Sequence, residues 1–249
     1  NLAGQLDGTD GITLTYGKTT DKGTLAFNNE RAPLNDPRVR EALRLGVDHE
    51  AIIKAIGAGN TLYGPIPPTD PGYEDLAKLV PFDPAKAKAL LKEAGQEDLQ
   101  LTLTIPSFYG TTVSTVLVSM YNDIGVTLKV NAVEFNTWLE DVYTNKDYDL
   151  SFVLHVEARD FGNWANPEYY FNYDNPKVQQ LYAEAMASTD QAKVDALLAE
   201  AARIVSSDNA ADWLYNAETV TALRPGITGF PVDSINARIN LANVEVASE

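Results

Sequence analysis

Two hydrophobic periodicities alternate between residues 99 and 155, and this alternation restricts the fold more than any other feature of the chain. Residues 99–105, 126–133 and 148–155 show strand-like patterns, whereas 111–124 and 135–143 place apolar residues at helical spacing. A strand–helix–strand–helix–strand order favours parallel strands joined by right-handed crossovers. The sequence therefore predicts an α/β domain whose central sheet is mainly parallel and flanked by helices.

Capping residues place two further helices before this segment. Asp36 and Pro37 indicate a helix start, because aspartate accepts from exposed backbone N–H groups and proline suits the first helical position. Asp48 begins a second helix, which Gly57 and Gly59 end. Apolar periodicity indicates the other elements, namely strands at 12–16, 24–28 and 220–223 and helices at 84–94, 176–187 and 191–206.

Two loops are candidates for a ligand site, because ligands of parallel α/β sheets bind beyond the carboxyl ends of the strands. These loops are residues 106–110 and 156–173. The second loop mixes aromatic rings with amides and charges, a composition that suits a polar, partly apolar ligand. The alternative is that its rings pack beneath the loop and hold it in place.

Three segments, in order, carry a resemblance to a known family. Residues 27–53 read FNNERAPLNDPRVREALRLGVDHEAII, residues 64–68 read GPIPP, and residues 82–95 read FDPAKAKALLKEAG. Together they resemble blocks of the bacterial extracellular solute-binding proteins of family 5. That family contains the receptors for oligopeptides, dipeptides, nickel complexes and some saccharides that feed ABC importers. The matching segments continue to about residue 230, so the resemblance covers most of the chain.

The resemblance implies a fold and a division of the chain. It implies a lobe of the type II periplasmic-binding-protein kind, with residues 1–225 as the C-terminal α/β lobe and 226–249 as a tail that crosses back to an N-terminal lobe. Only about a dozen residues precede the first predicted strand. We therefore expect the chain to be a fragment, whose first lobe, signal sequence and lipid-attachment cysteine lie in the longer protein.

Charge and cysteine content exclude several functions. The formal net charge is −16, which repels phosphate backbones and anionic membranes, so we expect no nucleic-acid partner. The chain has no cysteine, and hence no disulfide, thiolate nucleophile or thiolate metal ligand. No apolar run approaches the roughly 20 residues that a membrane-spanning helix needs. We also expect no cofactor.

The two histidines give little support for catalysis or metal binding. His49 lies at a helix start without the HExxH spacing of a zinc site, whereas His155 ends a strand on the predicted ligand side. A hydrolase would need Ser107 or Ser151 beside His155, and no G-x-S-x-G motif supports either serine. We therefore predict neither an enzyme nor a metal site.

The second loop also resembles the family's W-x-x-D-Y-P-D-P motif, whose first aspartate binds the α-ammonium group of peptide ligands. Anchored on Pro167, the motif reads Asn163-Trp164-Ala165-Asn166-Pro167, with both aspartates replaced by asparagine; alternatively, Asp160-Phe161 is the equivalent pair. Asparagine offers an ammonium only a neutral acceptor, so a saccharide or amine-free solute becomes an alternative to a peptide. The predicted ligand-binding residues are Phe108, Tyr109, His155, Arg159, Asp160, Asn163, Trp164 and Asn166.

The function implied by the resemblance is solute capture for an ABC importer by closure of two lobes. The implied partners are a small peptide or oligosaccharide, the N-terminal lobe and the transporter permease, and the receptor is expected to be a monomer. Its implied location is the extracellular face of the membrane, with a lipid anchor on the full-length protein, or the periplasm. A hydrolase-like enzyme and a surface scaffolding protein are the alternatives from other classes.

Overall fold

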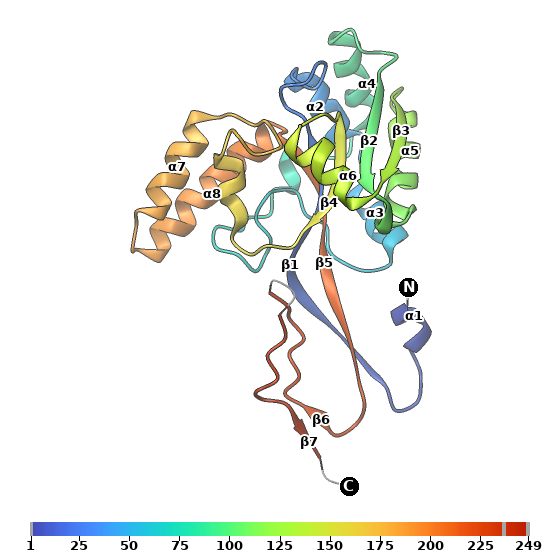
Figure 1. Cartoon of the computed structure of the whole chain (residues 1–249), viewed down its shortest axis with the longest axis vertical. Helices are drawn as coiled ribbons and strands as arrows, with labels where there is room; N and C mark the ends of the chain where they lie inside the picture. Colours follow the sequence, from blue (N-terminus) through green and yellow to red (C-terminus); the bar gives the residue numbers. More distant parts are fainter. Residues whose placement is uncertain (1, 236–237, 248–249) are drawn as a thin grey trace.

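The computed structural model describes residues 2–235 and 238–247, whose main body is built on one five-stranded sheet (Figure 1). The strand order is β3-β2-β4-β1-β5. The strands are β1 (Thr13–Phe27), β2 (Gln100–Pro106), β3 (Thr127–Val133), β4 (Leu150–His155) and β5 (Ala211–Leu223). Strand β2 pairs in parallel with β3 and β4, whereas β1 pairs antiparallel with β4 and β5. Within the described sheet, four strands therefore point the same way and β1 opposes them.

The helices cover the sheet on two sides and bury two hydrophobic clusters. One cluster lies under α2 (Pro37–Leu45), α3 (His49–Ile56), α4 (Pro84–Glu93) and α5 (Thr112–Asp123). The other lies under α6 (Phe135–Trp138), its π-helical continuation η3 (Leu139–Thr144), α7 (Pro176–Met186) and α8 (Gln191–Ser207). Along β1, Leu25 and Phe27 enter the first cluster and Ala26 the second, as expected for a strand buried on both faces. The central sheet flanked by helices is confirmed.

The predicted helix starts are confirmed at atomic detail. The Asp36 side chain accepts a hydrogen bond from the Arg38 backbone N–H, and Pro37 is the first helical residue. Asp48 accepts from the Ala51 N–H in the same way. Gly57 ends α3 with φ 78°, a left-handed conformation that glycine adopts without steric cost.

The first and last strands are longer than the sequence predicts. Residues 12–16 and 24–28 were expected to form separate strands, but β1 is continuous from Thr13 to Phe27, and β5 begins at residue 211 rather than 220. A register shift between Lys18 and Lys22 lies in the polar stretch that interrupts the apolar pattern. There the Asn216 Nδ2 donates to the carbonyls of Thr19 and Asp21 at 3.1 and 2.9 Å, which supports the irregular backbone.

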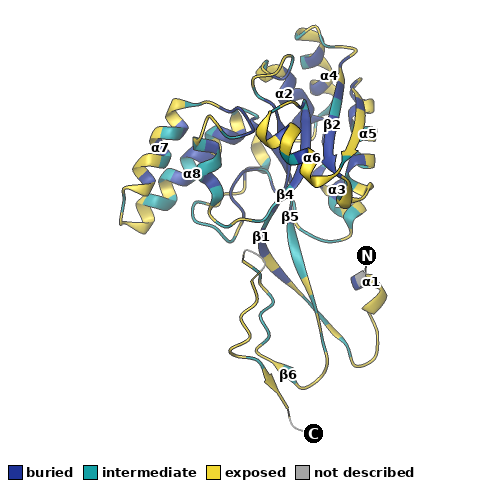
Figure 2. Ribbon diagram, in the orientation of Figure 1, coloured by how far each residue is buried: buried dark blue, intermediate teal, exposed yellow. Residues whose placement is uncertain are grey.

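The two ends of the chain form an arm that leaves the body (Figure 1). We define the arm as residues 2–18, 218–235 and 238–247. It contains α1 (Leu2–Leu6), the outer halves of β1 and β5, and the short strands β6 (Ile227–Thr228) and β7 (Glu245–Val246). Residues 2–18 and 218–225, which the sequence analysis assigned to the lobe, thus lie in the arm. Figure 2 shows that this arm is largely exposed, in contrast to the buried sheet of the body.

Among the described residues, no helix has both the length and the apolar character that crossing a membrane requires.

Candidate functional site

The strand register shows which end of the sheet faces the arm. Along β4, Leu150 pairs with Phe27 and His155 pairs with Lys22. Since Lys22 lies closer to the arm along β1 than Phe27 does, β4 runs toward the arm. The parallel strands β2 and β3 run the same way. We call the surface at these strand ends, formed by residues 107–109, 135 and 155–160, the carboxyl-end face.

Exposed aromatic rings lie on this face. Phe108, in the 3-10 turn η2 (Ser107–Tyr109), is 65 % exposed, and Phe135 at the start of α6 is 45 % exposed. Their ring centroids are 5.8 Å apart, and Phe135 stacks on the buried Trp138 with an interplanar angle of 4°. Tyr109 Oη accepts from the Leu154 backbone N–H at 2.9 Å, which holds η2 beside β4. The two exposed rings form a surface on which a planar or apolar group can stack.

Phe135 was not among the sequence-predicted ligand residues. It lies in the segment that directly follows β3. The rule that selected residues 106–110 after β2 applies equally to the end of β3. The signal was therefore available in the predicted strand order.

A buried lysine connects the arm to the candidate site. The Lys22 ammonium donates to the carbonyl oxygens of Thr20 and Glu157 at 2.9 and 3.0 Å, and lies 3.1 Å from Asp160 Oδ1. Burial raises the pKa of Asp160, and the nearby Lys22 charge partly opposes that rise. No sequence signal pointed to Lys22, because it lies in the polar stretch between two predicted strands.

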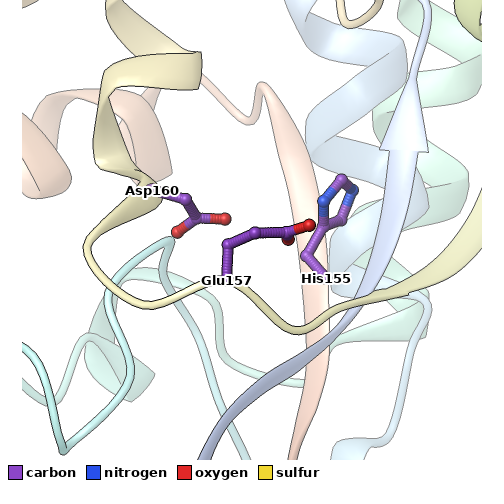
Figure 3. A group of neighbouring side chains, drawn as sticks. All are labelled: His155, Glu157 and Asp160. Atoms are coloured by element: carbon purple, nitrogen blue, oxygen red, sulfur yellow. The ribbon is translucent and has the colours of Figure 1, made fainter. Parts of the chain in front are cut away.

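His155, Glu157 and Asp160 lie close together at the end of β4 and in the loop that follows (Figure 3). One potential ligand atom from each lies within 4.8 Å of the others, which is the spacing of a possible metal site. His155 Nε2 is hydrogen-bonded to Tyr170 Oη at 2.9 Å. Burial, followed by the Lys22 charge, lowers the pKa of His155 to about 3, so the imidazole is neutral at pH 7. In the described structure, the positive charge beside the Asp160 carboxylate is the Lys22 ammonium.

Trp164 lies in the core rather than on the carboxyl-end face where the sequence analysis placed it. It is 3 % exposed and belongs to the 3-10 helix η4 (Asp160–Ala165). Its ring stacks on Phe171 at a centroid distance of 4.0 Å and packs edge-on against Trp213 at 5.0 Å. A large ring on a short helix that follows a buried strand gains more by packing inward than by facing water. Tyr170, Phe171 and Tyr173 are buried as well.

The other predicted residues lie along the same loop with different exposures. Arg159 has an exposed side chain and a left-handed backbone with φ 55°, and its N–H donates to Asp70 Oδ2 at 2.5 Å. Asn163 is half-buried within η4. Asn166 is exposed, and its Oδ1 accepts from the Glu168 N–H at 3.0 Å. The structure thus brings Phe108, Tyr109, His155, Arg159 and Asp160 to the carboxyl-end face. Asn163 lies within η4, and the Asn166 side chain bonds to the neighbouring backbone.

Curated relatives are similar to the chain along most of its length. Heme-binding protein A of Haemophilus influenzae is 29% identical over 242 residues, which is 88% of this chain and 43% of that protein. The probable D,D-dipeptide-binding periplasmic protein DdpA of Escherichia coli is 27% identical, over 83% of this chain and 43% of its own length. The dipeptide-binding protein of Escherichia coli is 51% identical over 77 residues, or 30% of this chain. The chain therefore spans less than half the length of these relatives.

Solved structures share the fold. The periplasmic binding protein DppA of Helicobacter pylori, in complex with the peptide STSA, superposes with a TM-score of 0.84 at 21% identity, over 98% of this chain and 50% of that one. HbpA2 of Haemophilus parasuis gives 0.86 at 20% identity, over 99% and 52% of the two chains. The chain thus has the fold of one part of these longer proteins.

The family assignment follows from a match over most of the chain. Residues 2–176 match the family described as "Bacterial extracellular solute-binding proteins, family 5 Middle". The matched range includes the three segments that carried the resemblance, as well as β1 to β4 and the carboxyl-end face. This chain belongs to the bacterial extracellular solute-binding proteins of family 5.

Proposed function

We propose that this chain is one lobe of a receptor that captures a peptide-like solute for an ABC importer. Several relatives are named as dipeptide- or di/tripeptide-binding proteins. The chain covers 43% of the length of relatives such as DdpA, so the rest of the full-length receptor would supply the second lobe. The receptor would hold its solute between the lobes by hinge closure and present it to the permease.

The observation that carries this proposal is that the arm leaves the body on the side of the carboxyl-end face. A second lobe attached to the arm would therefore lie opposite Phe108, Phe135 and the His155–Asp160 loop. The arm also exposes apolar side chains, among them Tyr16, Ile239 and Val246, the last 74 % exposed. Exposed apolar side chains gathered on one segment are typical of a surface that another domain covers.

The second candidate is a receptor for a solute without a free amine, such as an N-blocked peptide or a saccharide. The Lys22–Asp160 ion pair favours it, because a ligand ammonium would have to compete with Lys22 for that carboxylate. Asn163, the other candidate for the anchoring position, offers only a neutral amide oxygen, which attracts an ammonium less strongly than a carboxylate does. The exposed rings of Phe108 and Phe135 suit stacking against a sugar or a peptide group alike.

The same site supports binding rather than catalysis. A serine hydrolase needs a serine hydroxyl within hydrogen-bond reach of its base. In the described structure His155 Nε2 is bonded to Tyr170, Ser151 Oγ accepts from Trp138 Nε1 at 2.9 Å, and Ser107 is exposed on η2. We infer that the chain catalyses no reaction. We also propose that the full-length receptor is a monomer at the extracellular face of the membrane, lipid-anchored, or in the periplasm.

Calorimetry on the full-length receptor tests the proposal. The ligands are a dipeptide, its N-acetylated form and a disaccharide, and native mass spectrometry identifies any co-purifying solute. We expect binding of at least one ligand by the full-length protein and weak or no binding by residues 1–249, because one lobe supplies part of the contacts. Sub-micromolar binding by this chain alone would contradict the proposal. So would a full-length receptor that binds none of the three ligands.

Two substitutions separate the two candidates. Asp160→Asn removes the carboxylate beside Lys22, and Asn163→Asp adds one at the alternative anchoring position. If the solute has a free amine, one of the two changes should alter dipeptide binding and leave the N-acetylated form unaffected. Equal effects on both forms would favour the amine-free solute.

A further inference from the structure

A partly open cavity of about 170 Å³ lies between the loop of residues 65–71, the start of η4 and the α7–α8 pair. Its wall is mostly apolar and includes Ile66, Phe161, Met186, Val194 and Leu198, whereas Asp70, Arg159 and Asp160 are its charged lining residues. Ile66, Phe161 and Leu198 are almost completely buried, so these walls are held by the core. The cavity is therefore a preformed feature of the fold.

The volume decides what the cavity can hold. Complete small-molecule ligands occupy pockets of roughly 300–1,000 Å³, so this cavity is too small for a whole peptide or sugar. An apolar protein cavity of about 150 Å³ binds a benzene molecule. The cavity thus matches one aromatic ring or one branched aliphatic side chain, and its apolar wall disfavours a charged group.

The cavity adjoins the carboxyl-end face through Asp160. That residue lines the cavity and also belongs to the His155–Glu157–Asp160 cluster. The loop of residues 65–71, which forms the opposite wall, is also held at the carboxyl-end face. Asp70 accepts a hydrogen bond from the Arg159 N–H. Thr69 Oγ1 donates to the Thr19 carbonyl at 3.3 Å, close to the start of the arm. A solute that crosses the carboxyl-end face would therefore pass the polar edge of the cavity.

We propose that this cavity is a subsite for one apolar side chain of the solute, of the size of leucine or phenylalanine. This inference rests on the proposed function, since it assigns a specificity to the same face. Asp160 and Asp70 at the edge would face the solute main chain, and the side chain would enter between Phe161 and Val194.

The chain offers an internal reporter and an internal control for the cavity. It contains two methionines. Met186 lines the cavity, whereas Met120 on α5 packs against the other hydrophobic cluster. In a methyl NMR titration of the methionine-labelled chain with benzene, the Met186 signal should shift saturably and the Met120 signal should stay in place. Equal responses of both methyl groups, or no response, would overturn the subsite.

Filling the cavity provides the matched variants. Val194→Phe should abolish the benzene-dependent shift of Met186, whereas Ala196→Phe, at an exposed position of the same helix, should preserve it. If Val194→Phe does not fold, as judged by circular dichroism, Val194→Leu fills less of the cavity and should weaken the response. A filled variant that still responds like the parent would contradict the proposal.

The full-length receptor then distinguishes the subsite from the function. Calorimetry with Ala-Ala, Ala-Leu and Ala-Phe should show at least about tenfold tighter binding of the peptides with the larger side chain, the scale on which apolar pockets discriminate. Val194→Phe should remove this preference, so that the three peptides bind with similar affinity, whereas Ala196→Phe should keep it. Peptide binding with a preference that Val194→Phe does not alter would overturn the subsite alone. If none of the three peptides binds, the proposed peptide function is wrong, and the cavity is not a subsite for a peptide side chain.

Discussion

The Lys22 ammonium lies 3.1 Å from the Asp160 carboxylate, and this pair joins the root of the arm to the loop of the candidate site. Both side chains are largely withdrawn from water, at 2 % and 11 % exposure. The pair thus differs from the chain's exposed ion pairs, which contribute little to stability.

Replacing the lysine should therefore destabilise the body. Lys22→Met leaves Asp160 as an uncompensated buried charge, and removal of one partner of a buried pair costs about 3–5 kcal/mol. Urea unfolding measures the loss. Lys86→Met, which removes the exposed partner of Glu41, is the control and should cost less than about 1 kcal/mol. Equal losses in the two variants would show that the Lys22 pair has no special role.

Two of the predicted ligand-side aromatic residues, Trp164 and Phe108, should respond to truncation in opposite ways. Trp164→Ala removes a core ring and should lower the free energy of unfolding by about 3–5 kcal/mol. Phe108→Ala alters an exposed ring and should leave stability within about 0.5 kcal/mol. In the full-length receptor, Phe108→Ala should weaken solute binding by about 1–3 kcal/mol if its ring is a stacking platform. Thermal melts and calorimetry on the same samples would expose a reversed pattern.

Acid should destabilise the body through His155. Its pKa falls from 6.5 in the unfolded chain to about 3 in the folded chain. The unfolded state therefore takes up the proton first, and the stability contributed by His155 above pH 6.5 is lost as the pH falls toward 3. The loss approaches about 1.4 kcal/mol per pH unit within that window.

The raised pKa of Asp160 acts in the opposite direction, so the His155 effect is measured as a difference. Urea unfolding of the parent and of His155→Gln at pH 7.5, 6 and 5 provides it. The parent should lose more stability than the variant over this range. Parallel pH profiles would mean that folding does not lower the pKa of His155.

Residues 230–235 should separate locally from β1 when a side chain is added at Gly17. A Cβ atom at Gly17 would lie 1.9 Å from the Val232 carbonyl oxygen, which is too close for any real contact. Gly17→Ala should displace residues 230–235 and speed hydrogen exchange of the Ser234 N–H, which donates to the Lys18 carbonyl at 2.9 Å. Gly4→Ala, where a Cβ meets no atom within 4 Å, is the control. An unchanged exchange rate of the Ser234 N–H in Gly17→Ala would mean that residues 230–235 do not pack against Gly17.

Local signals predicted the elements of the body because each element's own residues specify it. Asp36 and Asp48 cap their helices wherever those helices pack, and the two periodicities identify β2 to β4 and α5 without reference to the rest of the chain. The middle of β1, residues 17–23, and the start of β5, residues 211–219, have no such signal. They are strands because β1 and β5 pair across about 200 residues of sequence, as Gly17 does with Thr219 and Gly23 with Tyr215.

The candidate site was predicted in position but less well in its individual residues. The rule of strand ends located Phe108, Tyr109 and His155, and it would also have located Phe135. Composition could not show that Trp164 faces the core, because an aromatic ring in a loop suits either side equally. Lys22 could not be found, since its proximity to Asp160 depends on the pairing of β1 with β4.

The central position of β1 has a consequence for synthesis. Of the five strands of the described sheet β1 is synthesised first, and its neighbours β4 and β5 follow more than 100 residues later. Until then both of its edges offer unpaired N–H and C=O groups, the feature by which nascent strands aggregate. The charged stretch from Lys18 to Lys22 interrupts its apolar pattern, and charges within an apolar strand oppose wrong pairing. We therefore expect the polar residues that obscure β1 in the sequence to reduce aggregation of the nascent chain.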